Sequence, residues 1–322
     1  MKRRHLLHAA SAALVLPRIA IAQAYPAKPI RYIVPVAAGG GNDMIARVVT
    51  ERWGRLLGQA FVVDNQSGGG GVVASMTTAR SVPDGYTLMQ GYVATHGTTP
   101  ATRKVGYDAL KDFTPIGMIG ATPNVLAINS TLSAKTLAEF VDYVKRNPGR
   151  VNYGSAGPGS LTHLTMELFK QETGAFMLHI PYRGIAPAIN DLLGGQTQAM
   201  FPGLAAALPH LRSGRMRALA VTGKARSAQL KDVPTMEEVG FKGFDAMQWY
   251  GSVGPAGIAP DIVKRLNDTQ VAVLKSPDLR EKLSGEAVEP WPMSPNEFGD
   301  FIRAEIARWT ALAKARNIQL ED

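Results

Sequence analysis

Three consecutive glycines, Gly39 to Gly41, stand where the backbone itself could bind an anion. They follow a short apolar run, Ile30 to Val36, and Asn42 and Asp43 come directly after them. This order predicts a strand, a glycine loop and a helix N-terminus, which directs free backbone N–H groups and the positive end of a helix dipole at one spot. A carboxylate could be held there without a lysine. On this loop alone, the alternative that the glycines only allow a tight turn stays open.

A second segment repeats the order of strand, glycine loop and helix. Val151 to Tyr153 lead into the glycine-rich stretch 154–160, and Ser160 is well placed to cap a helix that begins at Leu161. Two such segments facing each other across a cleft would hold an acid from both sides. The duplication therefore favours an anion site over a simple turn.

The elements that position these loops follow from the spacing of apolar residues. Behind the first loop, apolar residues recur at three- and four-residue steps, which predicts a helix with one buried face. These residues are Ile45, Val48, Val49, Trp53, Leu56 and Leu57, while Arg47, Arg52 and Arg55 lie on the other side. A similar stripe predicts a C-terminal helix over 295–316 with a core-facing side, formed by Phe298, Ile302, Ile306, Trp309 and Leu312.

From Tyr25 onward, strands alternate with amphipathic helices, which predicts an α/β fold with parallel sheets and helices on both faces. Ligands on such sheets bind beyond the carboxyl ends of the strands, so the loops after Val36 and Gly91 should face one cleft. This adds Tyr92 and His96 as candidate contacts. We expect two doubly wound lobes, the first comprising 25–123 and 248–322 and the second 124–247.

Composition limits the functional classes. With 322 residues, 45% hydrophobic and 19% charged, the chain can bury the cores of two lobes. It has no cysteine, which excludes disulfides, thiolate metal sites and a cysteine nucleophile. The formal charge is +9. The basic residues are scattered rather than clustered, so a nucleic-acid partner is not expected. We predict a monomer without cofactor or metal.

Residues 1–24 have the pattern of a cleaved export signal. Basic residues from Lys2 to Arg4 precede an apolar run, Leu6 to Leu16, and small residues follow in A-x-A spacing at Ala20 and Ala22. The run is far shorter than the roughly 20 apolar residues that cross a bilayer. Removing the segment reduces the net charge to +5, because four basic residues leave with it. We expect a periplasmic protein exported by the general secretion pathway, with the twin-arginine route left open by Arg3 and Arg4.

Six motifs together resemble the Bug-type solute receptors of the tripartite tricarboxylate transporter family. They are VPVAAGGGNDMIAR, SVPDGYTL, YDALKDFTPI, NPGRVNYGSAGPGSLTHLTMELF, HIPYRGIAPAINDLLGGQ and VPTMEEVG, in this order. The resemblance implies a periplasmic binding protein whose two α/β lobes close on a small carboxylate and deliver it to membrane transporter subunits. A carboxylate sensor that signals to a sensor kinase is the alternative.

The resemblance also implies where the ligand is held. The sequence departs from the family's usual pattern at two places. Asn42 stands where serine or threonine is commoner, and Asn65-Gln66-Ser67 lacks the usual proline after the asparagine. The resemblance and the two glycine loops together give these candidate ligand-binding residues: Ala37, Ala38, Gly39, Gly40, Gly41, Asn42, Asp43, Tyr92, Ser155, Ala156, Ser160, His163, Gly184, Ile185 and Ala186.

Several roles stay open at this point. Asp43 either caps its helix or orients a ligand-bound water, and His163 is either a ligand contact or a structural residue. Arg183 could pair with a carboxylate, although solvation is favoured. Trp249 and Tyr250 fit a core or a cleft equally. The strongest enzymatic alternative, a serine hydrolase using Ser155 and His163, has no identifiable acid partner. The loops match neither a Walker nor a dinucleotide motif.

Overall fold

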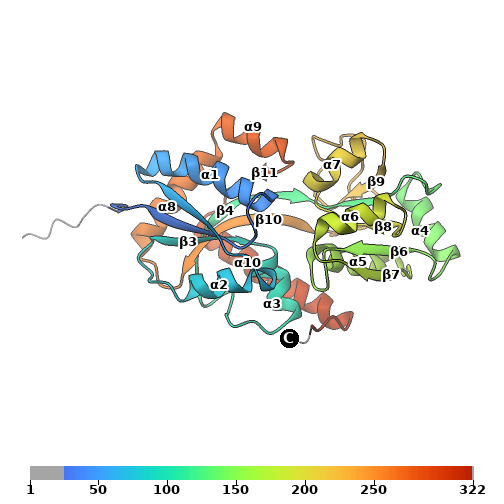
Figure 1. Ribbon diagram of the computed structural model, residues 1–322, viewed down its shortest axis with the longest axis horizontal. Helices are drawn as coiled ribbons and strands as arrows, with labels where there is room; N and C mark the ends of the chain where they lie inside the picture. The colour runs from blue at the N-terminus through green and yellow to red at the C-terminus, as the bar shows by residue number, and fades with distance from the viewer. Residues whose placement is uncertain (1–24, 321–322) are drawn as a thin grey trace, which may run out of the picture.

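A computed structural model describes residues 25–320, which fold into two lobes, each built around one sheet (Figure 1). We call the elements on the six-stranded sheet lobe 1 and those on the five-stranded sheet lobe 2. The predicted signal segment, 1–24, lies outside the described residues. None of the helices within 25–320 combines the length and the apolar character needed to cross a membrane.

The lobe 1 sheet mixes parallel and antiparallel strands. Strand β1 runs parallel to β2 and β3, as expected, but β10 pairs antiparallel with both β3 and β4. The prediction of an all-parallel sheet is wrong here, because β4 leaves the lobe and β10 re-enters it in the opposite direction. Across the sheet the strands are β11 (Glu289–Pro290), β4 (Phe113–Pro123), β10 (Met247–Pro255), β3 (Thr87–Tyr92), β1 (Ile30–Val34) and β2 (Phe61–Asn65).

Helices cover both faces of this sheet. In α1 the predicted apolar face is buried at Ile45, Val49 and Trp53, but Leu56 is 55% exposed because it lies at the edge of that face. The stripe on α10 is buried at Phe298, Ile302, Trp309 and Leu312, as predicted, while Ile306 is half-buried. The helical elements are α1 (Gly41–Leu57), η1 (Gly69–Gly71), α2 (Val72–Ala79), the π-type turn η2 (Ala94–Thr98), α3 (Thr99–Thr102), α8 (Pro260–Leu274), α9 (Pro277–Gly285) and α10 (Pro295–Ala315).

Lobe 2 repeats this design on a smaller scale. Strands β6, β7 and β8 are parallel, and β5 pairs antiparallel with β8 and β9. Across the sheet the strands are β7 (Leu178–Pro181), β6 (Asn152–Ser155), β8 (Ala199–Met200), β5 (Val125–Asn129) and β9 (Met216–Val221). Its helices are α4 (Leu137–Arg146), α5 (Leu161–Thr173), α6 (Ile185–Leu193) and α7 (Leu204–Arg212).

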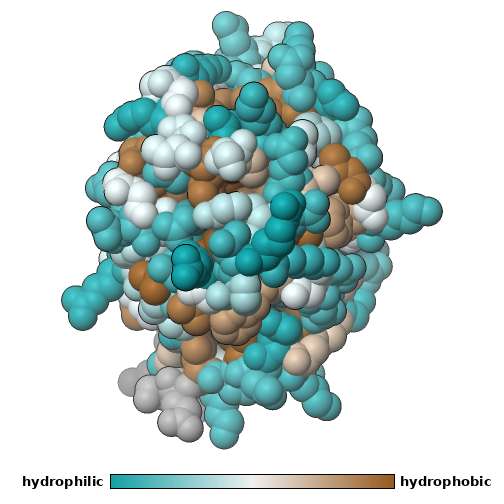
Figure 2. Space-filling view, turned by 90° about the vertical axis from the view of Figure 1, so that its right-hand side faces the viewer, coloured by the Kyte–Doolittle hydropathy of each residue, from teal (hydrophilic) through white to brown (hydrophobic). Residues whose placement is uncertain are grey.

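The outer face of lobe 2 carries hydrophilic and hydrophobic side chains interspersed (Figure 2). Among the larger exposed apolar residues of this lobe are Phe176, which is 56% exposed, and Leu178, which is 46% exposed and begins the edge strand β7. Most apolar side chains of the lobe are instead buried in a core around Phe140, Phe169 and Phe201. The lobe thus has its own hydrophobic core.

The two passages of the chain between the lobes lie side by side. Asn124 separates β4 from β5, and Thr222 follows β9. The Asn124 N–H donates to the Thr222 hydroxyl at 2.9 Å, and that hydroxyl donates to the Ala246 carbonyl at 2.7 Å. A second connection lies at α5, whose Leu161 and Leu164 share a hydrophobic cluster with Trp309 of α10. The lobes therefore meet at hydrogen-bonded strand crossings and also at the contact between α5 and α10.

Candidate functional site

A pocket of about 660 Å³ lies between the lobes. Six of the sequence-predicted site residues line it: Gly41, Asn42, Tyr92, Ala156, Ser160 and Ile185. The loops after β1, β3 and β6 therefore meet at one cavity, together with the start of α6. The remaining nine predicted residues do not line it; these are Ala37, Ala38, Gly39, Gly40, Asp43, Ser155, His163, Gly184 and Ala186.

The first-lobe loop presents an open helix N-terminus to this pocket. Helix α1 begins at Gly41, and its N-cap, Gly40, offers no side-chain acceptor. The first N–H groups of a helix have no intrahelical partner, so those of Gly41 and Asn42 are available at the pocket wall. Because the helix dipole adds positive potential there, this wall favours an anion.

Asp43 is held by the protein and does not line the pocket. It is 4% exposed and accepts hydrogen bonds from Gly39 N–H at 2.9 Å, Asn65 Nδ2 at 2.9 Å and Arg47 Nε at 3.0 Å. Burial alone would raise its pKa, but bonds from Arg47, Gly39 and Asn65 outweigh that effect and lower the pKa. Since Asn65 also donates to the Val36 carbonyl at 3.1 Å, this carboxylate shapes the loop.

In lobe 2, two further helices begin at the pocket without side-chain caps. The N-cap of α6 is Gly184 and that of α7 is Gly203, and neither is capped by a side chain. Ile185, Ala205 and Ala206 line the pocket wall. The contribution of α7 was missed by the sequence analysis, although a glycine between a short strand and an apolar helix was a visible signal. Three uncapped helices thus converge on one cavity.

The amides of the loop after β6 have hydrogen-bond partners within the protein, including that of Ala156, which the sequence analysis named as a candidate contact. Ala156 N–H donates to Thr162 Oγ1 at 2.8 Å, and Gly157 N–H donates to Ser155 Oγ at 3.1 Å. Gly159 N–H donates to His163 Nδ1 at 3.1 Å. Side chains of β6 and of α5 therefore accept hydrogen bonds from the amides of Ala156, Gly157 and Gly159, which are not free for a ligand.

His163 supports this loop from behind. The residue is 7% exposed, and its ring stacks on that of His179 with 4.0 Å between ring centroids. Burial lowers the pKa of each imidazole to about 4, so both are neutral at pH 7. His179 Nε2 lies 2.6 Å from Ser155 Oγ. The hypothesised pairing of Ser155 with His163 is wrong, and Ser155 is itself fully buried.

Five polar side-chain atoms around the pocket are buried without a hydrogen-bond partner among residues 25–320. Buried polar groups are nearly always hydrogen-bonded in native proteins, so these atoms are available to hydrogen-bond a polar molecule in the pocket. Four of these atoms are donors or hydroxyls, and one is an amide oxygen. They are Asn42 Nδ2, Thr98 Oγ1, Arg103 Nε, Thr122 Oγ1 and Asn124 Oδ1. Of the five residues, sequence analysis named only Asn42.

Aromatic hydroxyls complete one side of the pocket. Tyr250 lines it, together with Tyr92 and Glu286, whereas Trp249 is fully buried and donates to Glu305 at 2.9 Å. Burial, the neighbouring Tyr92 and the charge of Glu286 raise the pKa of Tyr250. Its hydroxyl is therefore a neutral donor at pH 7. Of these two adjacent residues, Trp249 therefore belongs to the core and Tyr250 to the cleft.

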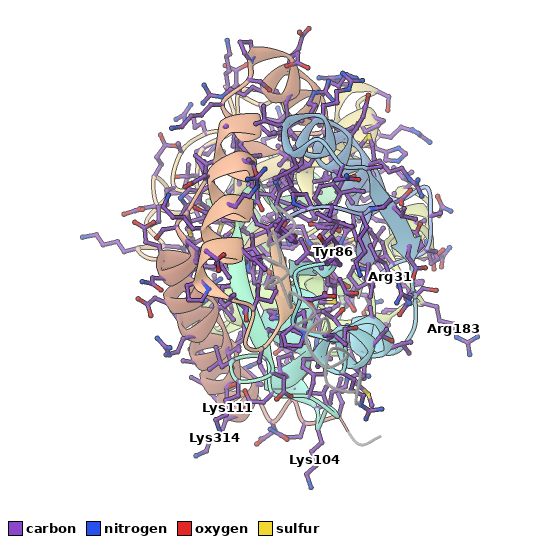
Figure 3. All side chains as sticks on the ribbon, turned by 90° about the vertical axis from the view of Figure 1, so that its left-hand side faces the viewer. Arg31, Tyr86, Lys104, Lys111, Arg183 and Lys314 are labelled. Atoms are coloured by element: carbon purple, nitrogen blue, oxygen red, sulfur yellow. The ribbon has the colours of Figure 1, made fainter. Side chains whose placement is uncertain are left out.

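Two further residues lie away from the pocket. His96 is fully buried against the ring of Phe113, with 4.6 Å between centroids, because it lies in η2 beneath the pocket wall. Its prediction as a cleft contact is wrong. Arg183 is exposed, and its side chain extends outward from the ribbon (Figure 3), in agreement with a solvated role.

Comparisons with known proteins agree with the two-lobed architecture. A sequence model of the tripartite tricarboxylate transporter family receptor matches residues 45–318. Protein BugT of Bordetella pertussis is 37% identical over 308 residues, which cover 93% of each chain. Among solved structures, R. palustris Rpa4515 with adipate is 36% identical with a TM-score of 0.81, covering 90% of this chain and 97% of that one.

The periplasmic binding protein BugD is 32% identical, with a TM-score of 0.79, and the match covers 92% of this chain and all of that one. These likenesses confirm the periplasmic binding protein fold and the resemblance drawn from the six motifs. The chain belongs to the receptor family of the tripartite tricarboxylate transporters and is a Bug-type member of it.

Proposed function

We propose that the protein captures a small carboxylate in the pocket between its lobes and delivers it to membrane subunits of a tripartite tricarboxylate transporter. The observation that carries this proposal is the convergence of three uncapped helices, α1, α6 and α7, on one cavity. Each contributes free N–H groups and a positive dipole end, and together they complement an anion. The adipate bound by the relative Rpa4515 is an acid of this kind.

The unpartnered side chains supply the remaining hydrogen bonds. Asn42 Nδ2, Thr98 Oγ1 and Thr122 Oγ1 are donors that a carboxylate oxygen would accept, and each is buried. Bonds to an ionised acceptor are the stronger kind. We assign first-lobe binding to Gly41, Asn42 and these threonines. The assignment of the other sequence-predicted residues as ligand contacts stays a prediction that applies to a closed form.

Capture requires the lobes to move relative to each other. We propose that 25–123 with 248–322 and the segment 124–247 move as two units about the paired crossings at Asn124 and Thr222. Crossing strands held by few hydrogen bonds can absorb a hinge rotation. A cleaved signal segment, 1–24, would place the mature chain in the periplasm, where the transporter's outer surface is accessible.

A thermal-unfolding screen of the mature chain against mono-, di- and tricarboxylates tests this function. A ligand at 100 times its Kd adds about 2.7 kcal/mol and raises the unfolding midpoint by several degrees. We expect a saturable shift with one chemical class of acid and none with the matching amides. Before the screen, mass spectrometry of denatured protein identifies any acid retained from expression. If neither a retained acid nor a shift is found, the proposal is wrong.

A further inference from the structure

We propose that the preferred ligand is a monocarboxylate that carries an ammonium group at its other end, with Arg103 pairing with the carboxylate and Glu286 with the ammonium. This inference rests on the proposed function and names the ligand class within it. The pocket is lined by one cationic and one anionic side chain, and these are Arg103 and Glu286. A ligand of matching polarity would neutralise both.

Arg103 is available for a carboxylate. It follows the last residue of α3, Thr102, and its Nε is buried without a hydrogen-bond partner among residues 25–320. No carboxylate of the described residues forms an ion pair with it, although fourteen such pairs occur elsewhere in this part of the chain. A guanidinium binds a carboxylate with two parallel hydrogen bonds, which is the pairing that this orphaned N–H favours.

Glu286 supplies the opposite charge. It follows the last residue of α9, Gly285, is half-buried, and forms no ion pair among residues 25–320. The amide oxygen of Asn124, an acceptor without a partner, belongs to the same side of the pocket. The residues that follow these two, Ala287 and Val125, share one hydrophobic cluster. The N-cap of α7, Gly203, bridges to Asn124 in this corner, but the full negative charge of Glu286 exceeds the partial positive charge of one helix end. An acceptor oxygen and a carboxylate therefore favour here a group that donates hydrogen bonds and carries positive charge.

The two charged residues both belong to lobe 1, where they follow different helices. Figure 1 shows α3, which precedes Arg103, on the lower side and α9, which precedes Glu286, on the upper side. A ligand spanning the pocket would therefore meet a cation at one end and an anion at the other. A dicarboxylate would place its second charge against Glu286, which costs affinity by repulsion.

Matched acids of equal chain length test this directly by isothermal titration of the mature chain. The probes are 4-aminobutanoate, 5-aminopentanoate and 6-aminohexanoate, each paired with the dicarboxylate and the simple monoacid of the same length. We expect at least one amino acid to bind about tenfold more tightly than both partners of its set, a difference of about 1.4 kcal/mol. Tighter binding of every dicarboxylate would overturn the inference but uphold the proposed function.

The variant Glu286→Gln supplies the decisive comparison. It should weaken binding of the amino acid and strengthen that of the dicarboxylate, so that the preference between them falls by about tenfold or more. Glu289→Gln is the matched control, because Glu289 is exposed on β11 and does not line the pocket. An unchanged preference in E286Q with normal folding would refute the inference. If no probe binds at any length and the broader screen is also negative, the proposed function fails as well.

Discussion

Arg316 and Glu167 join the two lobes through a two-pronged hydrogen bond. Arg316 Nη2 and Nε donate to Glu167 Oε2 at 2.8 and 2.9 Å. Arg316 follows α10 in lobe 1, and Glu167 lies in α5, the helix behind the loop that lines the pocket. The other carboxylate oxygen accepts from Tyr153, which precedes that loop on β6, at 2.6 Å. The end of the chain is thus connected to the pocket wall through one carboxylate.

Replacing Arg316 should loosen this connection. Glu167 is 6% exposed, and Arg316→Ala removes two of its hydrogen bonds, so we expect a loss of about 1–3 kcal/mol in the free energy of unfolding by urea. Arg303→Ala is the control, because its ion pair with Asp300 is exposed and should contribute about 0.5 kcal/mol or less. Equal effects of the two variants would contradict the role assigned to Arg316.

Stability should decline on mild acidification. Burial lowers the pKa of His163 and of His179 to about 4, against 6.5 as the ordinary value. Between these values the unfolded chain binds more protons than the folded one, so stability falls as pH decreases, by about 1.4 kcal/mol per pH unit for each histidine. The expected window runs from about 6.5 down to 4, and urea unfolding at stepped pH measures it.

A histidine variant isolates the effect. His179→Gln should reduce the slope of unfolding free energy against pH by about 1.4 kcal/mol per pH unit, which corresponds to one proton. His210→Gln, on α7, should change that slope much less. At lower pH the protonation of Glu167 determines how stability changes. Burial alone would raise the pKa of Glu167, but hydrogen bonds from Lys170, Tyr153 and Arg316 lower it to about 2. Its contribution is complete above about 4.5 and is lost as pH falls toward 2. An equal response of both histidine variants would contradict the assignment.

Thr98 should show opposite effects on binding and on stability. Its hydroxyl is buried at the pocket without a partner, which costs free energy in the empty protein. Thr98→Val removes this hydroxyl at nearly constant volume, so we expect equal or higher stability, by up to about 1 kcal/mol, and acid binding weakened about tenfold. Thermal unfolding and titration calorimetry measure the two quantities. Unaltered affinity would exclude Thr98 from the site.

Gly159 marks a close approach of the lobes. A Cβ atom there would lie 2.6 Å from Thr102 Oγ1 and 2.8 Å from Leu320 Cδ1, both in lobe 1. Gly174 is a matched control, because its φ of +66° is close to the +71° of Gly159 while nothing lies within 4 Å. Both alanine variants carry the backbone penalty of a positive φ. We expect Gly159→Ala to lose about 1–3 kcal/mol more than Gly174→Ala, because overpacking adds to it; equal losses would rule out this close contact.

The fold was largely predictable because its signals are local. The stripe ending at Trp309 and Leu312 predicted α10, and the repeated strand, loop and helix predicted the loops that meet at the pocket. The antiparallel pairing of β10 with β4 was not predictable, because strand direction depends on which lobe the chain returns to. The exposure of Leu56 was missed for a related reason. The helical period shows which residues share a face of α1, but it does not show how much of that face the neighbouring elements cover.

The site was predictable only in part. Glycine loops indicated Gly41 and Ser160, since backbone geometry follows from local composition. Thr98, Arg103 and Glu286 carry no local motif, and only the tertiary fold brings them to one cavity. The amides after β6 are hydrogen-bonded by side chains that reach back into the loop, such as those of Thr162 and His163. The glycine-rich composition therefore predicted more free N–H groups than the loop has.

Titration calorimetry of one acid against its neutral amide tests the central claim most directly. The mature chain should bind the acid selected by the thermal screen with one-to-one stoichiometry. The amide, which has the same shape but no charge, should bind about 100-fold more weakly, or about 2.7 kcal/mol, because it cannot exploit three converging helix dipoles and Arg103. Equal affinity for acid and amide, or binding that survives with Thr98→Val and Arg103→Ala combined, would contradict a carboxylate site in this pocket.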